Sequence, residues 1–163
     1  MAPVFMHPHT FVVHNTGITE RDFECELLTL KPDGTLTVKG GYAWDGCSPK
    51  IVICGLAFGT PDGIVDLNTG RPKTYFASLV HDALYQCKAT EIGVSRLEAD
   101  ALFLNMARHS GFRYAGLYYR LIRLFGGLYG SWSLEESDPA AIKRIKRSSL
   151  EYEVRPKTYR FAA

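Results

Sequence analysis

The chain has 163 residues, of which 46% are hydrophobic and 22% charged, and its formal net charge is only +2. This composition is typical of a globular protein and excludes an intrinsically disordered chain. The small net charge gives no support for nucleic-acid binding, and no apolar run reaches the ~18 residues that a transmembrane helix needs. At this length we expect one domain with a hydrophobic core of its own.

Cysteine and histidine usage gives little sign of a structural metal site. The first residues lack a basic segment followed by an apolar one, so no signal peptide is visible. Without an export signal, and without CxxC spacing, free thiols are favoured over disulfides or zinc ligands for Cys25, Cys47, Cys54 and Cys87. Near the N-terminus, the alternatives of metal binding and an ordinary surface role stay open for His7, His9 and His14.

The N-terminal part is predicted to be rich in β-structure. Residues 1–10 are expected to form a loose arm, and residues 11–14 and 23–30 to form strands, because apolar and β-branched side chains dominate them. The sequence K-P-D-G at residues 31–34 is a turn signal, since proline fixes φ and glycine accepts a positive φ. It predicts a β-hairpin over residues 23–39.

A long excursion over residues 49–73 precedes the helical part. Residues 51–58 are mostly apolar, and the turn sequences T-P-D-G and N-T-G follow them. A small hairpin, or a flap over a site, fits this pattern. Loops of this length in compact domains are often functional.

Three amphipathic segments then predict three helices. The first covers residues 74–87 and carries apolar side chains around most of its surface, so we expect it to be central and buried. The second begins at the capping box Ser95-Arg96-Leu97-Glu98 and ends at Gly111. The third covers residues 114–125 and is stopped by two glycines.

Beyond residue 131 the composition changes. Asp138-Pro139 predicts a helix N-terminus, and four basic side chains follow it. Their face is either a solvated helix surface followed by a tail, or a patch that touches anionic lipid headgroups. We therefore expect a single α+β domain with a β-rich part at 1–41, a three-helix core at 42–130 and a C-terminal extension at 131–163.

An adjacent histidine and aspartate, His81 and Asp82, interrupt the apolar first helix. Ionisable groups are costly to bury unless they are paired or hold a metal, so this pair needs partners. Tyr85 lies four residues after His81 and hence on the same helix face. It is placed to form a hydrogen bond with Asp100 of the second helix.

These residue types suit a calcium-assisted ester hydrolase. A histidine such as His81 can deprotonate water near neutral pH, and a carboxylate such as Asp100 can fix its tautomer. Calcium takes oxygen ligands and polarises a carbonyl as a Lewis acid. The carboxylates of Asp45 and Asp82 and the carbonyl of Gly46 are candidate ligands.

Each of these residues also has an ordinary explanation. His81 can be a core histidine with a satisfied ring, and Asp100 an exposed helix carboxylate. Asp82 can form a salt bridge to an arginine such as Arg96 or Arg120. Asp45 can be a turn residue and Trp44 a core or rim aromatic.

Several blocks resemble known families. The D-G-C-S loop at 45–48, the H-D-x-x-Y helix at 81–85, the aspartate and phenylalanine at 100 and 103, and the segment Y-Y-R-L-I-R-L-F-G at 118–126 resemble secreted phospholipase A2, most closely its bacterial and fungal branch. The pattern G-Y-x-W-D-G-x-S, H-D-A-L-Y and A-D-x-x-F resembles more closely an uncharacterised family of phage and bacterial proteins.

The phospholipase resemblance implies a phospholipase A2-like helical core and a phospholipid or membrane surface as partner. It makes His81 the general base, held by Asp100 with Tyr85, and it makes calcium the cofactor, bound by Asp45, Gly46 and Asp82. In that family the loop cysteine pairs with a cysteine three residues before the histidine. Here that position is Ser78, so Cys47 lacks this partner.

Two other functions are compatible with the sequence. One is a metal-dependent His-Asp phosphohydrolase, for which His14 and His109 are the further candidate ligands. The other is a non-enzymatic phage protein, either a virion component or an effector that binds a host protein through residues 49–73 and the basic tail. With no visible signal peptide, the resemblance to phage proteins implies the cytoplasm of a bacterial host or a phage virion.

Overall fold

The computed structural model describes residues 5–44, 51–53, 56–58, 64–87, 93–125 and 138–156. Its strands are β1 (Phe5–His7), β2 (Thr10–His14), β3 (Phe23–Glu24), β4 (Leu28–Leu30), β5 (Leu36–Val38), β6 (Tyr42–Trp44), β7 (Ile51–Ile53), β8 (Leu56–Phe58) and β9 (Glu151–Arg155). Its helices are α1 (Tyr75–Gln86), α3 (Arg96–His109), α4 (Ala115–Phe125) and α5 (Pro139–Arg147). The predicted α+β class is confirmed.

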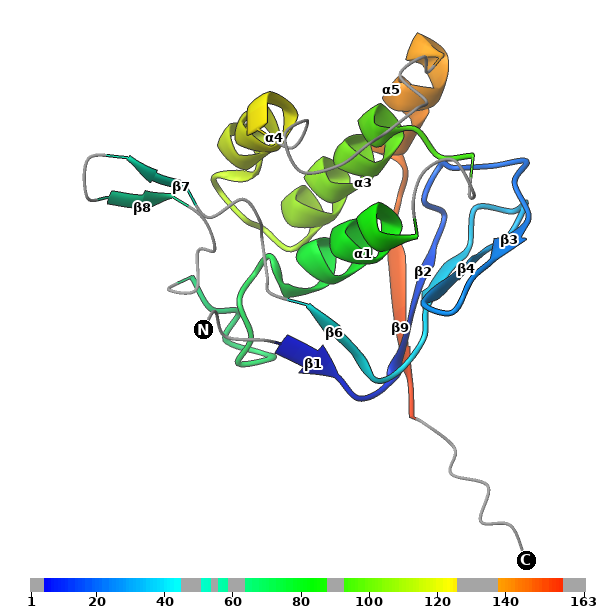
Figure 1. The fold of residues 1–163 in the computed structure, drawn as a ribbon, viewed down its shortest axis with the longest axis horizontal. Helices are drawn as coiled ribbons and strands as arrows, with labels where there is room; N and C mark the ends of the chain where they lie inside the picture. Colours follow the sequence, from blue (N-terminus) through cyan, green and yellow to red (C-terminus); the bar gives the residue numbers. More distant parts are fainter. Residues whose placement is uncertain are drawn as a thin grey trace, which may run out of the picture.

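The main sheet has five strands in the order β3-β4-β5-β2-β9, and each neighbouring pair is antiparallel. Strand β9 pairs with β2 along its full length, from Thr10 opposite Arg155 to His14 opposite Glu151. Figure 1 shows this last strand running beside β2 under the helices. Residues 151–155, expected to belong to a tail, therefore form the edge strand of this sheet among the described residues.

The predicted hairpin is confirmed, with one correction. Strands β4 and β5 pair around the turn at residues 31–34, where Gly34 has φ +83° and donates its amide to the carbonyl of Lys31. The single strand expected over residues 23–30 is wrong, because the chain folds back on itself after Cys25. The amides of Leu27 and Leu28 both point to the Cys25 sulfur, and β3 then pairs with β4.

Two further β-pairs lie outside the main sheet. The predicted loose arm is wrong for residues 5–7, since β1 pairs antiparallel with β6. A small hairpin is confirmed within the excursion at 49–73, where β7 pairs with β8. After it, the N-T-G sequence forms the expected turn, in which Asp66 accepts the amides of Asn68 and Thr69 and Gly70 has φ +65°.

Helix α3 is the centre of the helical layer, since it packs against α1, α4 and α5 (Figure 1). Its predicted capping box is confirmed: the Ser95 hydroxyl accepts the amide of Glu98, and the Glu98 carboxylate accepts the amide of Ser95. Helix α5 is capped by Asp138, as predicted. Because α5 is a fourth helix packed on α3, the expected three-helix core does not match.

The core joins the sheet to the helices. Phe11 and Leu36 of the sheet and Leu79, Leu102 and Phe103 of α1 and α3 are at most 1% exposed. Burial on this scale is the main favourable term in folding. Among the described residues, no helix has the length and apolar run that crossing a bilayer requires.

A disulfide joins Cys25, in the turn between β3 and β4, to Cys87, the residue directly after α1. The prediction of free thiols is therefore wrong for these two cysteines. Their sequence separation is 62 residues, and only the packing of α1 near the sheet brings their Cα atoms to 6.8 Å. Cys47 and Cys54 lie outside the described residues.

Candidate active site

Helix α1 places His81 in the protein interior. Residues on most sides of this helix are buried, and His81 itself is 5% exposed. Its ring lies 4.2 Å from the Tyr85 ring and 5.3 Å from the Phe103 ring, measured between centroids. The aromatic surroundings hold the imidazole in one orientation, with its edges toward the neighbouring polar groups.

The predicted group of His81, Tyr85 and Asp100 is assembled in the structure. His81 Nε2 lies 2.8 Å from Asp100 Oδ1, and the Tyr85 hydroxyl donates to the same oxygen at 2.7 Å. Asp100 is completely buried, so its alternative description as an exposed helix carboxylate is wrong. The carboxylate fixes the imidazole through Nε2, which leaves Nδ1 as the nitrogen that can exchange a proton elsewhere.

Two arginines complete the surroundings of Asp100. Arg123 of α4 donates to Asp100 Oδ2 at 2.9 Å, and Arg96 Nε lies 3.7 Å from the same oxygen. Arg96 also donates to the carbonyls of Ile122 and Arg123 in the last turn of α4. The buried carboxylate therefore connects α1, α3 and α4.

The sequence prediction missed Arg123 and named Arg96 only in the ordinary explanation of Asp82, as one of two example partners. Arg96 had been a candidate salt-bridge partner of Asp82, yet its guanidinium turns toward Asp100. Arg123 was recognised only as part of the segment Y-Y-R-L-I-R-L-F-G. Its position in the last turn of α4 gave no indication of which carboxylate it meets, because that contact depends on how α4 packs against α3.

The electrostatics favour charged forms of both His81 and Asp100. Burial acts to lower the pKa of His81, but the hydrogen bonds and charges of Asp100 and Asp82 outweigh it and raise the pKa to about 9. Burial acts to raise the pKa of Asp100, but its bonds to His81, Tyr85 and Arg123 lower it below the usual value. Burial and the nearby Asp100 charge raise the pKa of Tyr85, so Tyr85 stays a neutral donor.

Asp82 is the one expected calcium ligand that lies within the described residues. Its Oδ1 is 3.8 Å from His81 Nδ1, and its side chain is 14% exposed. Asp45 and Gly46, the other two, lie outside the described residues. Over the part of the chain that the structure describes, no group of three or more His, Cys, Asp or Glu side chains is arranged to hold a metal. The calcium site therefore stays a prediction.

Strand β6 leads toward this site. Trp44, its last residue, is 3% exposed and donates its indole N–H to the Ser78 hydroxyl at 3.0 Å. Trp44 is thus a core aromatic, as its ordinary explanation proposed. Ser78 precedes His81 by about one helical turn, so Trp44 anchors the end of β6 beside the same part of α1.

The remaining histidines have other surroundings. His14 contacts Thr35 and Glu153 across the sheet, and the His109 ring lies 4.8 Å from the Tyr152 ring. Since helices rise 1.5 Å per residue, His109 lies about 13 Å along α3 from Asp100. A shared metal site of His81, His14 and His109 finds no support in this arrangement.

His7 is buried in β1 and contacts the Tyr75 hydroxyl through Nδ1 at 3.3 Å. Burial, with smaller effects of the Arg71 and His9 charges, lowers the pKa of His7 to about 4. His7 is therefore neutral at physiological pH and packs among aromatic rings, including that of Phe76.

Comparison of the chain with family models, with curated proteins and with solved structures gives no match. The resemblances of the sequence motifs therefore stay expectations, and the function is argued from the residues themselves.

Proposed function

We propose that the protein is a calcium-dependent ester hydrolase of the phospholipase A2-like type, acting on phospholipid. The observation that carries the proposal is the buried hydrogen bond between His81 Nε2 and Asp100 Oδ1. A histidine held in this way through one nitrogen presents the other as a base, which is the arrangement that hydrolytic enzymes use to activate a nucleophile.

Each residue has a defined role in this proposal. His81 Nδ1 accepts the proton of the attacking water, and Asp100 orients the ring and stabilises the imidazolium. Tyr85 and Arg123 hold the two oxygens of Asp100 in place and are positioning residues. Asp82, with Asp45 and the carbonyl of Gly46, would bind calcium, which supplies positive charge for the developing oxyanion.

The proton affinity of His81 sets the working pH. With a pKa of about 9, only about one His81 in a hundred is neutral at pH 7. A base must be neutral to accept a proton, so hydrolysis would be slow at neutral pH and rise about tenfold per pH unit until about pH 9. If calcium neutralises Asp82, the pKa of His81 falls, and the rising part of the pH–rate profile should shift to lower pH when calcium is added.

Fatty-acid release from phosphatidylcholine vesicles in millimolar calcium tests the proposal. We expect release by the wild type, a loss of about 10²–10⁴-fold in His81→Gln, and loss on chelation. His109→Gln is the matched control, because it removes a histidine from the exposed end of α3, and it should keep the wild-type rate. The proposal is wrong if the wild type releases nothing while a known phospholipase works on the same vesicles, or if His81→Gln retains the rate.

One observation favours a second candidate, a non-enzymatic phage protein that keeps this scaffold. Asp100 contacts His81 and two arginines. A buried ion cluster of this kind can have a purely structural role, which here is to hold three helices in register. In that case a biological effect of the protein on a host would persist in His81→Gln, provided that the variant stays folded.

A further inference from the structure

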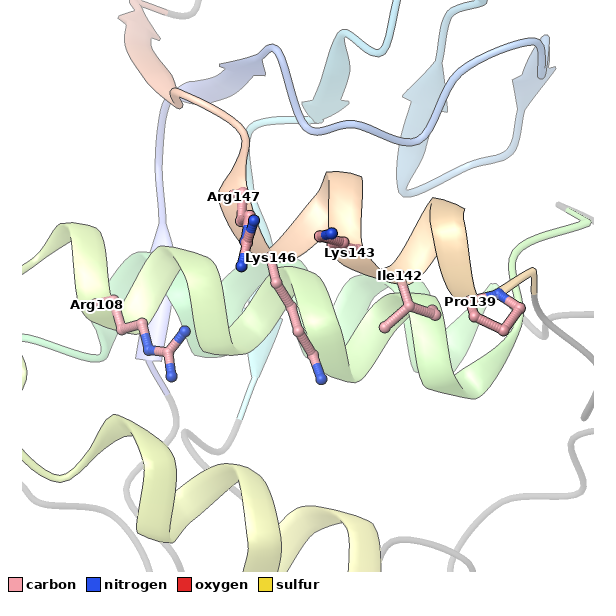
Figure 2. Close-up of a pocket in the computed structure, with 6 residues that line it drawn as sticks. All are labelled: Arg108, Pro139, Ile142, Lys143, Lys146 and Arg147. Atoms are coloured by element: carbon pink, nitrogen blue, oxygen red, sulfur yellow. The ribbon is translucent and has the colours of Figure 1, made fainter.

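A pocket of about 440 Å³ lies beside α5, on the opposite stretch of α3 from the candidate active site. It is lined by Arg108 of α3 and by Pro139, Ile142, Lys143, Lys146 and Arg147 of α5. Figure 2 shows Arg108, Lys146 and the apolar Ile142 and Pro139 extending toward the same space. Four cationic side chains thus surround a pocket with an apolar section at one end.

Three arginines near this pocket form hydrogen bonds or ion pairs, whereas three of the four cationic side chains that line it form none with the described residues. Arg96 and Arg123 meet Asp100, and Arg144, on the other side of α5, donates to the carbonyl of Gly17 at 2.9 Å. By contrast, the residues that the structure describes offer no hydrogen bond or ion pair to the side chains of Arg108, Lys143 and Arg147.

Lys146 is the least exposed of the four. It is half-buried, and its Nζ lies 4.7 Å from the centroid of the Tyr119 ring on α4. The ring attracts the ammonium group and limits the positions open to it, but it does not neutralise the charge. Lys146 is therefore held at the pocket with its N–H donors available.

The dipoles of α3 and α5 offset only part of the positive charge at the pocket. Arg108 and the pair Lys146 and Arg147 lie in the last turns of α3 and α5, where cations are stabilised. Each helix end carries about half a negative charge, so the two ends together offset roughly one of the four positive charges. The mutual repulsion of the remaining charges would be relieved by a bound anion.

We propose that this pocket binds a phosphate group carried next to an apolar moiety, as in the headgroup region of an anionic phospholipid or in a soluble phosphate ester. Arginine matches phosphate oxygens through paired N–H groups, and lysine adds flexible point charge. Pro139 and Ile142 provide the contact for the apolar moiety. A pocket of this volume suits one such group rather than the extended phosphate backbone of a nucleic acid.

This site goes beyond the proposed hydrolysis. Arg108 lies eight positions after Asp100 on α3, or about 12 Å along the helix axis. Binding at the pocket requires neither His81 nor calcium, so it can be measured in the presence of a chelator, and its outcome is independent of whether the protein is an enzyme.

The test is co-sedimentation of the full chain with vesicles of phosphatidylcholine alone or with added phosphatidic acid, in chelator. We expect binding only to the anionic vesicles. Each basic side chain at such a surface contributes about fivefold, so Lys143→Gln with Arg147→Gln should weaken binding about thirtyfold. The matched control is Lys31→Gln with Arg155→Gln, which removes two exposed charges from the sheet and should bind like the wild type.

Competition with glycerol phosphate and with an oligonucleotide distinguishes the sources. If glycerol phosphate at micromolar concentration displaces the protein from the vesicles, the ligand is a soluble phosphate ester. If it does not displace the protein, the ligand is the lipid. Equal losses in the pocket and sheet variants would mean that general charge drives binding, and would overturn the proposal. The proposal would also be overturned if the wild type bound neither the anionic vesicles nor glycerol phosphate. Tighter binding of the oligonucleotide than of both phosphate probes would overturn it as well. Thermal unfolding shows whether each variant is folded.

Discussion

Arg123 of α4 donates to the Oδ2 atom of Asp100 at 2.9 Å, while His81 of α1 contacts the Oδ1 atom of the same carboxylate at 2.8 Å. One buried side chain of α3 thus sets the positions of two other helices and the protonation of the histidine. Any change at Asp100 should therefore appear both in stability and in the titration of His81.

Asp100→Asn tests this dual role. The variant removes the charge that His81 and Arg123 face in the interior, and unpaired buried charges typically cost about 3–5 kcal/mol. The pKa of His81 should fall well below about 9, because the Asp100 charge that raises it against the effect of burial is gone. Denaturant unfolding and an NMR titration of the imidazole measure the two effects. An unchanged His81 pKa would contradict the assigned hydrogen bond.

Asp22→Asn is the control for this variant. Asp22 is an exposed carboxylate whose side chain is 68% exposed and which pairs with Lys31 at 3.5 Å. Surface pairs of this kind contribute about 0–1 kcal/mol, so stability should change little and the pKa of His81 not at all.

Stability should fall as the solution becomes alkaline. The pKa of His81 is raised from 6.5 to about 9 on folding, so the folded state binds the proton more tightly than the unfolded state. The resulting stabilisation is fully present below about pH 6.5, decreases between pH 6.5 and 9, and is lost above pH 9. Its size is of the order of 3 kcal/mol. Unfolding free energies at several pH values should show this slope, and His81→Gln should remove most of it.

Reduction of the disulfide should destabilise the protein. The bond between Cys25 and Cys87 closes a loop across 62 residues, and a crosslink of this span contributes about 4 kcal/mol in the chain-entropy description. We expect a lower melting temperature in dithiothreitol and a similar one for Cys25→Ser with Cys87→Ser. The double variant should not respond to dithiothreitol. A further response would show that another disulfide contributes to stability.

Gly17→Ala should be far more harmful than Gly70→Ala. Both glycines have positive φ, +81° and +65°, so an alanine is strained at either position by roughly 1–2 kcal/mol. At Gly17 a Cβ atom would also come within 2.9 Å of the Ile145 Cα atom, whereas at Gly70 nothing lies within 4 Å. The additional overpacking costs ~1–3 kcal/mol. Equal melting temperatures of the two variants would contradict the close approach of α5 to residue 17.

The parts of the fold that depend on local chemistry could be predicted from the sequence. The capping box at Ser95 and Glu98 and the N-cap at Asp138 are formed by residues a few positions apart, so their signals are complete in a short segment. The hairpin around Gly34 is local in the same way. The pairing of His81 with Asp100 was predicted because the adjacent His81 and Asp82 on an apolar helix need partners, and Asp100 of the next helix supplies a carboxylate that can fix an imidazole.

The parts that depend on packing could not be predicted in this way. The disulfide partner of Cys25, and the turn of the Arg96 guanidinium toward Asp100 rather than Asp82, both follow from how the helices lie against each other and against the sheet. Strand β9 is different, because its alternation of polar residues with Tyr152 and Val154 was a readable strand signal. The sequence prediction took the residues after the basic helix to be a tail and did not use this alternation.

The pairing of β2 with β9 has a consequence for synthesis. The ribosome makes Phe11, Val12 and Val13 near the beginning of the chain and their partners on β9 near the end. At a synthesis rate of about 5–20 residues per second, the edge of β2 that pairs with β9 stays unpaired for on the order of ten seconds. An unpaired apolar edge can add strands from other chains. Yield in the cell should therefore depend on what shields this edge of the nascent chain until β9 emerges.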